Sequence, residues 1–134
     1  MTVLIVEDTA ILRKVLRDIL GEFCGIQSEF IYEASDGMKA ISEYDRVRPN
    51  IVFLDINMPK LNGKNAIGQL IQIDPNARII MCTSSREESD VRECITAGAK
   101  DYLVKPLEPR RVKEAVIKVT ADMDKNILPE MLRG

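Results

Sequence analysis

Three carboxylates follow apolar segments of this sequence, at positions where strands are expected to end. Glu7 and Asp8 follow the apolar run 2–6, and Asp55 follows the run 51–54. Like charges held close together disfavour ionisation, and a hard divalent cation relieves that repulsion. Mg²⁺ prefers oxygen ligands and often takes one or two carboxylates together with a phosphate. The three acids therefore predict a Mg²⁺ site, provided that the fold brings the two segments together.

A hydroxyl and an ammonium group follow two further apolar segments. Thr83 comes after the run 79–82, and Lys105 comes after the run 102–104. A carboxylate such as Asp55 can attack phosphorus and form an aspartyl-phosphate. Phosphoryl transfer depends on positioning and on neutralising charge, which Lys105 would supply as a point charge. The Thr83 hydroxyl would donate a hydrogen bond only to a phosphoryl group that is present, and such conditional contacts shift conformational equilibria.

Short β-branched runs alternate with segments of helical periodicity along the chain. The expected strands are 2–6, 30–32, 51–54, 79–82 and 102–104, and the expected helices lie within 11–23, 38–47, 67–71, 85–97 and 109–123. This alternation indicates a parallel sheet with helices on both faces. Ligands of such sheets bind beyond the carboxyl ends of the strands. The sequence therefore predicts one α/β domain, a doubly wound (βα)5 fold with a five-stranded parallel sheet, whose carboxyl edge carries the reactive residues.

The first and fourth helices carry the most specific local expectations. In the first helix one buried apolar stripe is expected, formed by Ile11, Leu12, Val15, Leu16, Ile19, Leu20 and Phe23. The fourth helix is expected to begin at Ser85–Glu88, which has the form of a capping box. It should bury only Val91, Cys94 and Ile95 and end at Gly98. Because this stripe is thin, the fourth helix is expected to be weakly held and movable.

The composition excludes several classes of function. The 134 residues carry a net charge of −2 and have a pI of about 5.3, so no basic field is present to hold nucleic acid. The three cysteines lack the spacing of a zinc site or a disulfide frame, and there is no His. The chain shows neither a basic leader nor an apolar run long enough to span a membrane. These features predict a cytoplasmic protein that contacts no membrane and no nucleic acid directly.

The sequence resembles the receiver domains of two-component response regulators, the CheY-like family. Four motifs carry the resemblance, each at an expected strand end: Val6-Glu7-Asp8, Asp55-Ile56-Asn57-Met58-Pro59 with Gly63, Thr83-Ser84-Ser85 and Tyr102-Leu103-Val104-Lys105-Pro106. Any one motif alone would be weak, because acids also favour helix starts and most lysines are simply solvated. The resemblance implies a flavodoxin-like strand order 2-1-3-4-5. It also implies a receiver domain over 1–124 and a C-terminal tail over 125–134.

The resemblance implies roles at the metal and phosphoryl sites. Asp55 matches the phosphoacceptor, whose donor is a phosphohistidine on a sensor histidine kinase or a histidine phosphotransfer protein. Asp8 matches a direct Mg²⁺ ligand, Glu7 its acidic neighbour that acts through water, and Asn57 the position whose main-chain carbonyl completes the metal site. Many relatives have Asp where this chain has Glu7, which is one methylene longer and so reaches the metal or Lys105 differently.

Further roles implied by the resemblance concern the switch. Thr83 matches the switch hydroxyl, Lys105 the phosphate-binding lysine, and Tyr102 the aromatic ring that moves inward when the hydroxyl shifts. The Lys105-Pro106 peptide bond is commonly cis in the family. The expected output surface, which binds a downstream effector protein, comprises the fourth helix, the fifth strand and Arg110, Arg111 and Lys113.

The leading interpretation is a phosphorylation-dependent signalling switch that catalyses only its own phosphorylation and dephosphorylation. A phosphorelay intermediate would use the same chemistry. An aspartyl-phosphate phosphatase is less consistent with the sequence, because its second acid would fall at Asn57 and no cap-domain insert is present. A nucleotide- or flavin-binding domain lacks its Gly-rich phosphate cradle in the turn 7–10. The chain could also be the receiver piece of a longer DNA-binding regulator.

Overall fold

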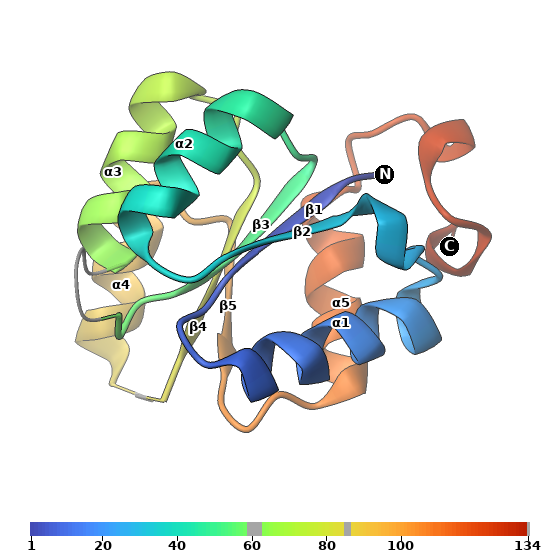
Figure 1. Cartoon of the computed structure of the whole chain (residues 1–134), viewed down its shortest axis with the longest axis horizontal. Coiled ribbons are helices and arrows are strands. Elements are labelled where there is room, and N and C mark those ends of the chain that lie inside the picture. The colour runs from blue at the N-terminus through green and yellow to red at the C-terminus, as the bar shows by residue number, and fades with distance from the viewer. Residues whose placement is uncertain (59–62, 85–86, 134) are drawn as a thin grey trace.

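Strands and helices alternate along the chain, as Figure 1 shows for the computed structural model. The structure describes residues 1–58, 63–84 and 87–133. The strands are β1 (Val3–Val6), β2 (Ile31–Ala34), β3 (Ile51–Asp55), β4 (Ile79–Thr83) and β5 (Asp101–Val104). The helices are α1 (Ala10–Cys24), α2 (Gly37–Val47), α3 (Gly63–Ile73), α4 (Glu88–Ala97) and α5 (Pro109–Val119). None of the described helices is both long and apolar enough to cross a membrane.

The five strands form one parallel sheet in the order β2-β1-β3-β4-β5, which confirms the predicted fold. Its register brings the strand ends to one edge. Val6 pairs with Leu54 at the ends of β1 and β3, and Asp55 pairs with Cys82 across β3 and β4. Thr83 in turn pairs with Val104 at the ends of β4 and β5. The residues that follow these positions therefore meet at the carboxyl edge of the sheet.

Helices cover both faces of the sheet, with α2, α3 and α4 on one side and α1 and α5 on the other (Figure 1). Successive residues of a strand point to opposite faces. Val3 and Ile5 accordingly pack with the apolar residues of α1 and α5, while Leu4 and Val6 pack with those of α2 and α3. Because both faces are covered, the central strands are apolar throughout.

The apolar stripe of α1 is narrower than the sequence indicated. Leu16, Ile19 and Leu20 are buried, but the expectation was wrong for Ile11, Leu12, Val15 and Phe23, which are exposed. A helix turns by about 100° per residue. Val15 and Ile11 therefore lie about 100° and about 140° around the helix from Leu16, away from the sheet. Leu12 and Phe23 share the face of Leu16 but lie near the two ends of the helix, where cover is incomplete.

Helix α4 begins at Glu88, the last residue of the predicted capping-box segment. Glu87 is its N-cap residue and makes no side-chain capping bond of its own. The capping box itself stays a prediction. Ser85 and Arg86 lie outside the described residues, as does Pro59 of the second motif. The helix ends at Gly98 as predicted, with φ at 127° and a close approach to Ile71 that a Cβ would obstruct.

Helix α4 buries few apolar side chains against the rest of the described protein. Cys94 is fully buried and Val91 is partly buried, but Ile95 is 43% exposed, which corrects the expectation of a third buried residue. Val91 and Cys94 are three residues apart and share a face, whereas Ile95 lies about 100° further round the helix. Among the described residues, the apolar contact of α4 with the core is thus small and comprises Cys94 with the partly buried Val91 and Ala97.

The C-terminal residues form two 3₁₀ turns, Lys125–Ile127 and Glu130–Leu132, that fold back onto the α1 and α5 side of the protein. Leu128 and Leu132 are buried in the same apolar cluster as Leu20 and Val116. The segment is therefore packed onto the core. The boundary between a domain 1–124 and a tail 125–134 stays a prediction.

Candidate phosphorylation and metal site

The three acids singled out in the sequence converge at the carboxyl edge. One carboxylate oxygen from each of Glu7, Asp8 and Asp55 lies within 4.8 Å of the other two. Glu7 and Asp55 are buried, and Asp8 is exposed. The Glu7 Oε2 atom is buried and has no hydrogen-bond partner among the described residues. A buried, unpartnered carboxylate oxygen beside two further acids has the donor chemistry that a hard cation such as Mg²⁺ requires.

Lys105 lies between two of these acids. Its Nζ is 3.2 Å from Asp55 Oδ2 and 3.3 Å from Glu7 Oε1. The Lys105 N–H donates to the Thr83 carbonyl at 2.8 Å, which holds the backbone after β5 in place. The Lys105-Pro106 peptide bond is cis, as expected. The lysine thus neutralises part of the acidic charge and faces the carboxylate predicted to accept the phosphoryl group.

The pKa values of the two buried acids, Glu7 and Asp55, shift in opposite directions. Burial raises the pKa of Glu7 to about 7, and contact with the Asp55 carboxylate adds to the increase although Lys105 opposes it. Burial also acts to raise the pKa of Asp55, but hydrogen bonds from Glu7 and from the Asn57 main chain, together with Lys105, outweigh it and lower that pKa. Asp55 is therefore the more readily ionised member of the pair, and the Glu7 carboxyl group, with a pKa of about 7, is only partly ionised near neutral pH.

The remaining predicted residues surround Asp55 without all touching it. The Asn57 main-chain N–H donates to Asp55 Oδ1 at 2.9 Å, which fixes the orientation of the carboxylate. The Asn57 side chain donates to Ser84 Oγ at 3.4 Å. Thr83 is fully buried at the end of β4, on the strand next to Asp55. The register therefore puts the predicted switch hydroxyl at the same sheet edge as the predicted acceptor.

Tyr102 lies one strand further away. It is half-buried on β5, and the Arg111 guanidinium lies over its ring, 5.8 Å from the centroid. Arg111 also donates to the Tyr102 carbonyl at 2.8 Å and pairs with the buried Asp101 at 3.1 Å. These contacts hold α5 against β5 at the place where the sequence predicted a movable aromatic ring.

An apolar cavity of about 220 Å³ opens beside the reactive groups. Leu12 and Val15 of α1 line it together with Leu107, and Asp55 and Lys105 contribute polar groups. Leu12 and Val15, which the sequence analysis placed in the core, thus line a cavity that Asp55 also lines.

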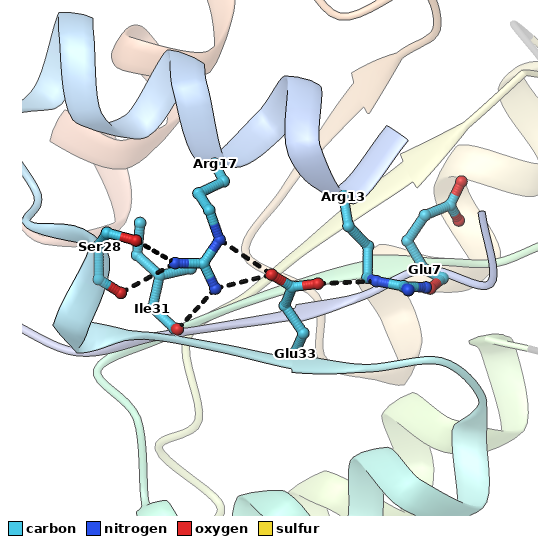
Figure 2. Close-up of polar contacts among 6 residues, drawn as sticks. All are labelled: Glu7, Arg13, Arg17, Ser28, Ile31 and Glu33. Atoms are coloured by element: carbon cyan, nitrogen blue, oxygen red, sulfur yellow. Dashed lines mark hydrogen bonds and ion pairs between the residues drawn. The ribbon is translucent and has the colours of Figure 1, made fainter. Parts of the chain in front are cut away.

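Sequence reasoning missed one contact of the acidic turn. Arg13 of α1 donates from Nη1 to the main-chain carbonyl of Glu7 at 2.7 Å and from Nε to Glu33 at 2.8 Å (Figure 2). Arg17, one turn further along α1, binds the other oxygen of Glu33. A basic residue in the first turns of a helix that follows an acidic turn was the only available signal, and its partner on β2 is distant in sequence.

The similarity of the chain to known proteins agrees with this geometry. A sequence profile of the response regulator receiver domain matches residues 3–117, most of the chain. The chain belongs to the response regulator receiver family. Receiver domains are signalling switches of two-component systems, they bind Mg²⁺ at an acidic pocket, and CheY-like receivers interact with histidine kinases and downstream effectors. In this chain Glu7, Asp8 and Asp55 form an acidic cluster.

Individual relatives are similar along nearly their whole length. The chain is 45% identical to the chemotaxis protein CheY of Thermotoga maritima over 118 residues, 88% of this chain and 96% of that protein. It is 41% identical to CheY of Bacillus subtilis over 116 residues, 87% of this chain and 94% of that protein. The CheX–CheY–BeF3–Mg²⁺ complex of Borrelia burgdorferi contains a chain of similar structure, with a TM-score of 0.79 and 33% identity over 93% of this chain and 90% of that one.

Proposed function

We propose that Asp55 accepts a phosphoryl group in a two-component phosphorelay, with Mg²⁺ bound by Glu7, Asp8, Asp55 and the main-chain carbonyl of Asn57. The observation that carries this proposal is the position of Lys105 Nζ, 3.2 Å from Asp55 Oδ2, beside three converging carboxylates. An acidic cluster alone would bind a cation. A lysine beside the attacking carboxylate would also supply the positive charge that neutralises a transferred phosphoryl group.

In the proposed reaction an Asp55 carboxylate oxygen attacks phosphorus, and the bond from phosphorus to the donor breaks. With a phosphohistidine donor, on a sensor histidine kinase or a histidine phosphotransfer protein, the bonding electron pair leaves with the imidazole nitrogen. Lys105 stays at hydrogen-bonding distance of a phosphoryl oxygen, and the Asn57 N–H keeps the carboxylate oriented. Mg²⁺ held by the Glu7, Asp8 and Asp55 carboxylates would help to neutralise the charge of the phosphoryl group.

We place the switch in Thr83 and Tyr102. The Thr83 hydroxyl would donate to a phosphoryl oxygen, and the Tyr102 ring would follow it inward. The output surface would then be α4, β5 and α5, including the exposed Arg110 and the ring-stacked Arg111. Support comes from the small apolar contact of α4, because a weakly held helix can move at little cost.

This output surface is tested by titrating a downstream effector protein with three forms of the chain. These are the unmodified wild type, the wild type treated with beryllofluoride and Mg²⁺ as a phosphoryl mimic, and the variant Asp55→Asn in the same mixture. A higher affinity in the mimic-treated wild type alone is expected. Equal affinities of all three forms would reject the proposed switch.

The protein would thus be a switch whose only catalysis is its own phosphorylation and dephosphorylation. A phosphatase acting on external substrates finds less support, because Asn57 offers a neutral amide where such an enzyme needs a second acid. The cytoplasmic location and the lack of direct nucleic-acid contact remain predictions from the sequence.

Intact mass spectrometry after incubation with acetyl phosphate tests the acceptor. The wild type should gain one phosphoryl group in the presence of Mg²⁺ and none in EDTA, and Asp55→Ala should gain none. Asp45→Ala is a matched control, because it removes an exposed aspartate far along the chain from the acidic turn and should be phosphorylated like the wild type. An adduct that persists in Asp55→Ala would show that another residue is the acceptor.

A further inference from the structure

The main chain of Glu7 is held from two sides. Its N–H donates to the carbonyl of Ala34 on β2 at 3.0 Å, and its carbonyl accepts from Arg13 Nη1 at 2.7 Å. The turn has little other side-chain support, because Thr9, the N-cap of α1, makes no side-chain capping bond. The Arg13 contact therefore fixes the turn that joins β1 to α1, and this turn carries the acids Glu7 and Asp8.

Arg13 is itself held in place by Glu33. One carboxylate oxygen of Glu33 accepts from Arg13 Nε at 2.8 Å, and the other accepts from Arg17 at 2.7 and 2.9 Å. Arg17 is anchored in turn by the Ser28 and Ile31 carbonyls (Figure 2). Burial acts to raise the pKa of Glu33, but its hydrogen bonds from the two arginines lower it overall. Glu33 thus remains ionised and keeps both guanidinium groups oriented.

Figure 2 shows where the Arg13 charge is directed. The guanidinium reaches the main-chain carbonyl of Glu7, while the Glu7 carboxylate points away from it. The guanidinium is a rigid fork, so one side chain spans Glu33 and the Glu7 carbonyl at once. Arg13 therefore connects β2 to the acidic turn without pairing with the acids that would bind the cation.

We propose that Arg13 is a positioning residue for the cation site: it fixes the Glu7 main chain so that the Glu7 and Asp8 carboxylates stay within reach of Asp55. This inference rests on the proposed function, since it concerns the Mg²⁺ affinity of that site. Groups that orient metal ligands from outside typically change metal affinity by about 10–100-fold when they are lost. Arg13 acts through the backbone, so about tenfold is expected.

The sign of the effect separates positioning from simple electrostatics. If Arg13 acted only through its charge, its removal would take a positive charge away from a cation site and strengthen Mg²⁺ binding. If Arg13 positions the turn, its removal weakens Mg²⁺ binding despite the lost repulsion. The positioning and the purely electrostatic mechanisms thus predict opposite changes in the dissociation constant for Mg²⁺.

Arg17 provides a matched control on the same helix. Arg17→Gln removes an equal charge and breaks bonds to the same Glu33, but it leaves the contact with the Glu7 carbonyl intact. Both variants are expected to lower the midpoint of thermal unfolding. Only Arg13→Gln should weaken Mg²⁺ binding about tenfold.

The experiment is a Mg²⁺ titration of the full chain without phosphodonor, followed by NMR of the backbone amides of residues 7–9. Arg13→Lys is included as a second variant that keeps the charge but lacks the fork, and it should bind Mg²⁺ nearly as weakly as Arg13→Gln. This variant also preserves the test if Arg13→Gln does not fold. Unchanged or tighter binding in the Arg13 variants, or equal weakening in Arg17→Gln, would overturn the inference while the proposed function stands. Absence of Mg²⁺ binding in the wild type would reject both.

Discussion

The buried acid Glu7 makes the stability of the metal-free protein depend on pH in an unusual direction. Its side chain is 7% exposed and contacts Asp55, and burial raises its pKa from 4.5 to about 7. A group whose pKa is higher in the folded than in the unfolded state binds protons more tightly when folded. Its stabilising contribution is complete below pH 4.5 and is lost as the pH rises through about 7. We therefore expect the free energy of unfolding in EDTA to fall between pH 5 and pH 8.

The size of this decrease follows from the shift. One pKa unit corresponds to about 1.4 kcal/mol, so an increase from 4.5 to about 7 corresponds to at most about 3.5 kcal/mol. Other groups of the site act outside this window. The lowered pKa of Asp55 affects stability below its ordinary value of 3.8, and the raised pKa of Lys105 affects it near and above 10.5. The change between pH 5 and pH 8 should thus come mainly from Glu7.

The assay is urea unfolding in EDTA at pH 5, 6, 7 and 8, for the wild type and for Glu7→Gln. The glutamine variant keeps every other titrating group, so the difference between the two proteins isolates this carboxyl group. Its stability should change much less over the range, and it should exceed the wild type at pH 8. Saturating Mg²⁺ should reduce the decrease in the wild type, because a cation stabilises the ionised carboxylate. A wild-type stability that is constant or rises in EDTA would refute the reasoning.

Two further predictions concern the scaffold. Tyr44→Phe removes the hydroxyl that donates to Asp74 at 2.8 Å and should cost about 2 kcal/mol in urea unfolding, since the acceptor is a charged group; an unchanged midpoint would mean that water replaces the bond. Truncation after Met123 removes Leu128 and Leu132 from the apolar cluster and should cost about 3 kcal/mol, from burial of two leucines less the entropy of ordering the segment. The truncated protein should still be phosphorylated by acetyl phosphate, and loss of that reaction would show that the segment supports the distant site.

The fold, and the proximity of the reactive groups at one edge of the sheet, could be predicted from the sequence. Strand runs that are continuously apolar, alternating with helical periods, leave few arrangements besides a covered parallel sheet. Residues that directly follow such runs then share one edge, which is why Glu7, Asp55 and Lys105 were correctly expected to be neighbours. Their functional roles, and those of Thr83 and Tyr102, remain predictions that rest on the proposed experiments.

Details that depend on tertiary contact were not accessible. Ile11 and Val15 were predicted to be core residues but are exposed. The spacing of apolar residues does not show how much of the helix surface the sheet covers. The Arg13 contact needs the position of Glu33 on β2, and nothing local in the sequence relates these two residues.

The glutamate at position 7 contacts Lys105, which also contacts Asp55. In the structure Glu7 reaches the same ammonium that contacts Asp55, at 3.3 and 3.2 Å respectively. A phosphoryl group on Asp55 would compete for that ammonium, and Glu7 would then lose its one cationic partner in the described site while its Oε2 already lacks a hydrogen bond. A buried carboxylate without a counter-charge is strongly disfavoured unless it is protonated or bound to a cation. The geometry therefore links phosphorylation of Asp55 to occupancy of the acidic cluster, which is why the metal dependence of the adduct is its most direct test.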